Sequence, residues 1–182
     1  MLKTEENPVF AAVRTGAEFD AALTADVNVI FSLCTPIKEL ESMIKRAHEN
    51  NKYIFIHADM TEGISRDKAG IEYIAGFGAD GIISTHSALV RFGKELGLKV
   101  VQRFFFVDSQ SVKTAKSTLK TFRPDMVEIM PASSCGFIAD FCRELSIPLI
   151  AGGLITEKKD IINALSAGAE AVSTGKKELW NE

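Results

Sequence analysis

Short apolar runs recur along the chain at nearly even intervals, with an amphipathic segment between each pair. The eight runs centre on Val9, Val29, Phe55, Ile82, Val101, Val127, Leu149 and Val172. Successive centres lie 19 to 27 residues apart, which is the length of one strand, one helix and two short loops. The runs are continuous rather than alternating, as in residues 28–31 and 53–56, and this is typical of parallel strands buried on both faces.

The intervening segments carry helix signals. The segment that begins at Thr35-Pro36 has its apolar residues at helical spacing, and proline is favoured at a helix start. Glycines occur where a helix must give way to the next strand, at Gly78, Gly97 and Gly168. Such glycines commonly end helices.

Seven helix-bearing units and an eighth strand predict an α/β fold, a (β/α)₈ TIM barrel of minimal length. We expect residues 1–182 to form a single domain. Such barrels typically need about 250 residues, so the loops must be short and the last helix is expected only at residues 176–180. The alternative is an open doubly wound sheet, which usually has fewer strands and a glycine-rich first turn. Residues 13–16 form no such turn, so the barrel is favoured.

The composition fits a soluble globular protein, with 46% hydrophobic and 25% charged residues. The apolar runs are far shorter than the ~20 residues of a membrane span, and residues 1–20 have no apolar signal segment, so we expect a cytoplasmic protein without a membrane partner. Cys34, Cys135 and Cys142 are too few for a disulfide framework, and we interpret them as reduced thiols in packing roles. The net charge of −3 disfavours diffuse nucleic-acid binding but allows a local basic patch.

Ligands of such barrels bind where the strands end, and polar residues end nearly every predicted strand. The candidate pocket residues are Arg14, His57, Asp59, Thr85, Arg103 and Glu128. For any one of them a helix cap or a rim charge is the commoner explanation, but convergence at one mouth favours the set. His57 could be a general base, a hydrogen-bond donor to a ligand, or a core histidine. Glu128, in an apolar run, needs a partner, which Arg14, Arg103 or a ligand hydroxyl could supply.

The last two strands end in glycine-rich turns, and the loops after these strands are the frequent phosphate site of TIM barrels. The candidate phosphate ligands are Gly152, Gly153, Ser173, Thr174 and Gly175. Glycine lets backbone N–H groups close around an anion. The alternative is a pair of glycine turns without a ligand. No zinc-binding spacing is present, and we expect no metal.

A basic stripe follows the fifth strand. It consists of Lys113, Lys116, Lys120 and Arg123. Their spacing of three, four and three places them on one helix face, and no acidic residue lies between Ser109 and Arg123. A solvated helix face is the commoner explanation, and a patch for the phosphates of RNA is the alternative.

Several segments together resemble the glycerol uptake operon antiterminator family over most of the chain. They are His57-Ala-Asp-Met-Thr-Glu-Gly63, Asp80-Gly-Ile-Ile-Ser-Thr85, Gln102-Arg-Phe104 with Asp108-Ser109, Pro124-Asp125 with Glu128 and Pro131, residues 150–155, and residues 169–174 with Glu178-Leu-Trp180. The resemblance runs from about Val9 to Trp180.

This resemblance implies a TIM-barrel regulator that is not an enzyme and uses no cofactor. It implies glycerol 3-phosphate as effector and leader mRNA of glycerol-catabolic genes as partner, with early transcription termination prevented. Gly152, Gly153, Ser173 and Thr174 would hold the phosphate. His57, Asp59, Arg103 and Glu128 would meet the glycerol end or shape the pocket.

Two positions depart from the family pattern, because His86 stands where lysine is favoured and Ala132 where glycine is favoured. A homo-oligomer is left open. Two other functions remain as alternatives: an isomerase or aldolase of small phosphosugars, and a metabolite sensor that acts through a protein partner. No evident Schiff-base lysine ends a predicted strand, which weighs against the enzyme, but fold alone does not decide function.

Overall fold

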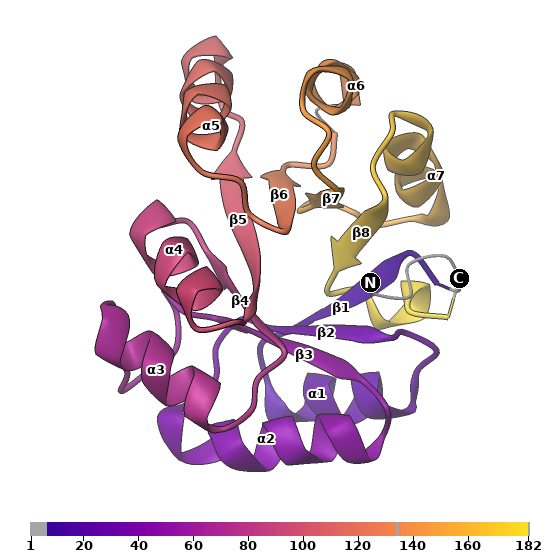
Figure 1. Cartoon of the computed structure of the whole chain (residues 1–182). Coiled ribbons are helices and arrows are strands. Elements are labelled where there is room, and N and C mark those ends of the chain that lie inside the picture. Colours follow the sequence, from indigo (N-terminus) through magenta and orange to yellow (C-terminus); the bar gives the residue numbers. More distant parts are fainter. Residues whose placement is uncertain (1–6, 134, 182) are drawn as a thin grey trace.

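Eight parallel strands close into a barrel that a ring of helices surrounds (Figure 1). The computed structural model describes residues 7–133 and 135–181, without the side chain of Cys135. The strands are β1 (Val9–Val13), β2 (Val29–Ser32), β3 (Tyr53–His57), β4 (Gly81–Ser84), β5 (Lys99–Phe105), β6 (Met126–Met130), β7 (Leu149–Gly152) and β8 (Ala171–Thr174). Each strand pairs with the next, and β8 pairs with β1. The predicted (β/α)₈ barrel is therefore confirmed.

The helices alternate with the strands, as the spacing of the apolar runs predicts. They are α1 (Gly16–Thr24), α2 (Ile37–Glu49), α3 (Lys68–Gly76), α4 (Ser87–Glu95), α5 (Ser109–Thr121), α6 (Cys135–Glu144) and α7 (Lys158–Ser166). After β8 the expected helix is a single 3₁₀ turn, Lys177–Leu179. Among the described residues, no helix is long and apolar enough to cross a membrane.

The core has two layers because each strand faces the barrel interior on one side and the helices on the other. In β3, Phe55 belongs to the inner layer, whereas Ile54 and Ile56 pack outward, as the alternation along a strand requires. The inner layer contains an aromatic row in which the ring centroids of Phe10 and Phe31 lie 5.3 Å apart and those of Phe31 and Phe55 lie 5.6 Å apart. These side chains fill the barrel below its mouth.

Short-range polar contacts fix the connections between helices and strands. Asp80 precedes β4 and accepts the N–H of Ile54 in β3 at 2.8 Å, and Asp125 precedes β6 and accepts the N–H of Val100 in β5 at 3.0 Å. The three predicted helix-ending glycines, Gly78, Gly97 and Gly168, all have positive φ, which glycine adopts without steric cost.

The two cysteines whose side chains are described, Cys34 and Cys142, are free thiols and half-buried. Burial raises the pKa of Cys142, so this thiol is a poor nucleophile. Both fit the predicted packing role, while the Cys135 side chain lies outside the described residues.

Candidate functional site

A buried polar layer lies at the carboxyl end of the barrel, directly above the apolar interior. Glu128 of β6 is fully buried and accepts hydrogen bonds from Arg103 Nε and from Ser173 Oγ, each at 2.5 Å. The sheet register sets Arg103 beside Glu128. The structure thus selects Arg103 from the partners that the sequence left open. A buried carboxylate with an ion-pair partner and a hydroxyl donor has its charge compensated.

Gly152 makes room for this layer. A Cβ atom at Gly152 would lie 2.6 Å from Ser173 Oγ and 2.7 Å from Glu128 Oε1, and Cβ atoms essentially never approach so closely. Because Gly152 of β7 has no side chain, Ser173 of β8 can reach Glu128 of β6 across β7. The direct phosphate contact expected of Gly152 stays a prediction.

A cavity of about 310 Å³ opens above the layer. Its lining comprises Ala12, Arg14, Leu33, Arg103, Met130, Gly153, Leu154, Ile155, Thr156, Ser173, Thr174, Gly175 and Lys176. Four of the five predicted phosphate ligands thus meet there. The cavity has three cationic side chains and no carboxylate in its described lining, which suits an anion.

Arg103 is the best-placed cation of this cavity. Its side chain is only 6% exposed, and Nε is occupied by Glu128. The two Nη groups have no partner among the described residues, and Arg103 lines the cavity. A guanidinium has five N–H donors in a planar fork, so most of its donors remain for a ligand.

His57 lies in the interior with its ring almost wholly buried, 2% exposed. Burial, and then the positive charge of Arg103, lower the pKa of His57 to about 4. The ring is therefore neutral near pH 7, and so low a pKa is poorly matched to general-base catalysis at that pH. Its Nδ1 is buried and has no partner among the described residues, so the ring retains an unused hydrogen-bonding atom.

Asp59 and Thr85 meet each other rather than the cavity. The Asp59 carboxylate accepts hydrogen bonds from Ser84 Oγ, from the Thr85 N–H at 2.8 Å and from Thr85 Oγ1 at 2.6 Å. Burial opposes ionisation of Asp59, but these hydrogen bonds outweigh it and lower the pKa of the carboxyl. Both residues therefore brace the β3 and β4 loops. The exposed ring of His86 also lies near this carboxylate, with Nδ1 3.5 Å from Asp59 Oδ2.

The predicted basic stripe lies on α5 and just beyond it. Two of its four cations already contact other residues of the protein. Lys116 Nζ contacts Glu144 Oε1 of α6 at 2.7 Å, and Arg123 Nη2 donates to the Ser146 carbonyl at 3.0 Å. Lys113 and Lys120 are exposed and have no ion-pair partner among the residues that the structure describes. These two are the cations of the stripe most available to an anionic partner.

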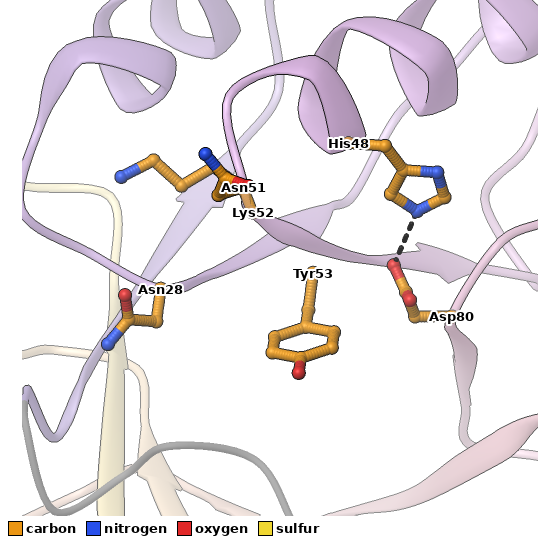
Figure 2. Close-up of a pocket in the computed structure, with 6 residues that line it drawn as sticks. All are labelled: Asn28, His48, Asn51, Lys52, Tyr53 and Asp80. Atoms are coloured by element: carbon orange, nitrogen blue, oxygen red, sulfur yellow. Dashed lines mark hydrogen bonds and ion pairs between the residues drawn. The ribbon is translucent and has the colours of Figure 1, made fainter.

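A second cavity, of about 410 Å³, lies at the opposite, amino-terminal end of the strands (Figure 2). Asn28, His48, Asn51, Lys52, Tyr53 and Asp80 line it. The sequence did not predict this cavity, because of its lining residues only Asp80 belongs to a family segment and the other five belong to none. In neither cavity, nor elsewhere in the described chain, do three His, Cys, Asp or Glu side chains gather to hold a metal ion.

Comparison with known proteins assigns the family. A family profile described as Glycerol-3-phosphate responsive antiterminator matches residues 9–180. The chain belongs to this family of antiterminators. The resemblance read from the motifs is thereby confirmed, and the matched range includes both cavities and the α5 stripe.

The similarity to individual members and relatives of the antiterminator family extends over nearly the whole chain. The uncharacterized protein YgcP of Escherichia coli (strain K12) is 32% identical over 176 residues, covering 96% of this chain and 92% of YgcP. The glycerol uptake operon antiterminator regulatory protein of Listeria monocytogenes has a similar structure, with TM-score 0.91, 27% identity, and coverage of 96% of this chain and 95% of that one. A glycerol uptake operon antiterminator-related protein of Thermotoga maritima has TM-score 0.84 at 25% identity, with 94% and 96% covered.

Proposed function

We propose that this protein is a glycerol 3-phosphate-responsive antiterminator that binds the leader mRNA of glycerol-catabolic genes and is not an enzyme. Membership of the antiterminator family supports the regulatory role. The observation on which the effector site rests is the buried guanidinium of Arg103, whose Nη groups reach a cavity lined by cations and glycine turns. A small phosphorylated polyol matches this chemistry.

In the proposed complex, the phosphate lies against the turns after β7 and β8. Gly153 and Gly175 allow close approach of the backbone to an anion there, and Arg14 and Lys176 lie in the same lining. The glycerol end points down toward Arg103, which donates from its free Nη groups. Gly152, Glu128 and His57 then belong to the floor that holds Arg103 in place.

The site offers little for covalent or acid–base catalysis. Glu128 is committed to Arg103 and Ser173, and His57 has a pKa too low to hold a catalytic proton near pH 7. The lysine in the cavity lining is Lys176, which follows β8 at the rim. A Schiff-base lysine needs a lowered pKa and a carbonyl substrate. These features favour binding over turnover.

The RNA partner is assigned to the basic face of α5. Lys113, Lys116, Lys120 and Arg123 provide charge that can neutralise backbone phosphates. Asp108 caps the start of this helix, accepting the Ser111 N–H at 2.7 Å, and it follows β5, the strand that contains Arg103. A ligand on Arg103 and an RNA on α5 would thus share one β–α unit.

The test measures binding of a leader RNA by filter retention, with and without glycerol 3-phosphate. We expect the effector to change RNA affinity by about 5- to 150-fold, the usual range of allosteric coupling. The double variant Arg103→Met/Glu128→Gln removes the effector's donors without stranding a buried charge, and it should bind RNA without responding to the effector. Equal RNA affinity of the wild type with and without glycerol 3-phosphate, or no RNA binding at all, would contradict the proposal.

A further inference from the structure

The cavity at the amino-terminal end of the barrel has an aromatic ring at its centre. Tyr53 is the first residue of β3 and is 36% exposed, unlike the rest of that strand, which is buried. Figure 2 shows its ring between Asn28 on one side and the His48–Asp80 pair on the other. A volume of about 410 Å³ is in the range of small-molecule sites.

The charged groups of this lining already have hydrogen-bond partners. Lys52 Nζ donates to the carbonyls of Ala25 and Val27, each at 2.7 Å. The Asp80 carboxylate contacts His48 Nε2 at 2.9 Å and accepts the N–H of Ile54. With one ammonium and one carboxylate among its described residues, the lining is near neutrality, which fits an uncharged ring better than a phosphate or a metal ion.

The amide groups of the lining add hydrogen-bonding capacity. Asn51 has φ of 55° and is exposed at the turn between α2 and β3, and its side chain has no hydrogen-bond partner among the described residues. Side-chain amides donate and accept at once, as the edges of nucleobases require.

We propose that this cavity binds an unpaired nucleobase of single-stranded RNA, stacked on the Tyr53 ring and contacted at its edge by Asn51. Bases splayed out of single-stranded loops are commonly recognised by aromatic stacking together with hydrogen bonds to their edges. The inference rests on the proposed function only in taking RNA as the ligand. It assigns a base-reading site where the family match and the motifs assign none.

Cations for the flanking phosphates are present at the same end of the barrel. Helices run antiparallel to the strands, so the end of α5 lies near the strand starts, with Lys120 on its last turn. Just beyond α5, the Phe122 ring has Arg91 Cζ at 5.5 Å and Lys94 Nζ at 5.7 Å from its centroid. Lys94 Nζ also donates to the Arg123 carbonyl at 2.6 Å, so Arg91 is the more available of the two. The base site and Lys120 therefore lie at the same end of the barrel.

The experiment measures binding of short fluorescein-labelled homopolymers of A, C, G and U by anisotropy. Tyr53→Ala should weaken binding of the preferred homopolymer by about 5- to 150-fold, the effect of losing one stacked base, while Tyr53→Phe should stay within about twofold of the wild type. The matched control is Tyr73→Ala, since Tyr73 on α3 is 47% exposed and is the chain's second tyrosine. Circular dichroism verifies that each variant is folded. Calorimetry with glycerol 3-phosphate tests whether the cavity at the carboxyl end of the strands still binds its proposed effector.

Three outcomes would overturn the inference: no homopolymer binds the wild type, Tyr53→Ala binds as tightly as the wild type, or Tyr73→Ala is as damaging as Tyr53→Ala. Failure of the proposed function has a different signature, since leader-RNA affinity would then be unaffected by glycerol 3-phosphate. A Tyr53→Ala protein that loses homopolymer binding but still releases the wild-type heat on titration with glycerol 3-phosphate would support the base site.

Discussion

At the scale of single residues, the site depends on how one buried carboxylate is accommodated. Glu128 lies in an otherwise apolar strand, and its charge is tolerable because Arg103 and Ser173 both donate to it. Arg103 is held in turn by Glu128 through Nε, which leaves its Nη groups without a partner among the described residues. Gly152 gives this arrangement the space it needs. The residues beneath the cavity therefore act mainly by positioning Arg103.

The first prediction concerns Gly152. Gly152→Ala would force a methyl group against Ser173 and Glu128, and we expect a loss of about 1–3 kcal/mol in the free energy of unfolding, as for other overpacked sites. Glycerol 3-phosphate affinity should fall with it. The measurement is urea denaturation, with Gly76→Ala as control, because a Cβ at Gly76 meets nothing within 4 Å. A Gly152→Ala protein as stable as the wild type would refute the spatial role.

The second prediction concerns His57 and pH. The pKa of His57 is about 4 in the folded chain and about 6.5 when unperturbed, so the unfolded state takes up a proton that the folded state excludes. Stability should therefore fall as the pH falls from 6.5 to 4, by up to about 1.4 kcal/mol per pH unit relative to His57→Gln. Denaturation across this range measures it. His86→Gln controls for loss of an exposed histidine, and parallel wild-type and His57→Gln curves would contradict the low pKa.

At the scale of elements, α5 follows β5, the strand that contains Arg103, and carries the basic stripe. The helix begins at the capping residue Asp108, three residues after β5 ends, and its Lys113 and Lys120 are exposed. Contacts with Glu144 and Ser146 engage Lys116 and Arg123. The available charge is thus smaller than the sequence stripe indicates.

The third prediction follows from this division of the stripe. Lys113→Ala/Lys120→Ala should weaken leader-RNA binding and flatten its dependence on salt by about 0.7 units of slope for each lost phosphate contact. A filter-binding salt series measures both quantities. Lys38→Ala/Lys45→Ala on α2 removes the same charge from another exposed helix face and should leave affinity and slope nearly unchanged. The same loss in both double variants would indicate only a general charge effect.

At the scale of the whole molecule, the sequence predicts the barrel well because each unit repeats the same local signals. Buried parallel strands are continuous apolar runs, and the spacing of these runs sets the number of units. The site is less predictable. The sequence could not choose the partner of Glu128, since Arg103 lies 25 residues away and meets it only through sheet register. Likewise, only loop geometry reveals that Asp59 is committed to Ser84 and Thr85.

The cavity around Tyr53 was missed for a related reason. A polar aromatic at the start of a strand looks like an ordinary rim residue, and its neighbours Asn28 and Asp80 come from other units of the barrel. Sequence motifs favoured the carboxyl end, where ligands of this fold usually bind. Whether the predicted residues there hold the effector stays a prediction.

The most direct test of the central claim, an effector site without chemistry, is a calorimetric titration with glycerol 3-phosphate followed by NMR of the same sample. The account predicts saturable heat with one ligand per chain, its loss in the Arg103→Met/Glu128→Gln variant, and an unaltered ligand spectrum after long incubation. Absence of heat from a folded wild type, or formation of any product that disappears in the variant, would contradict it.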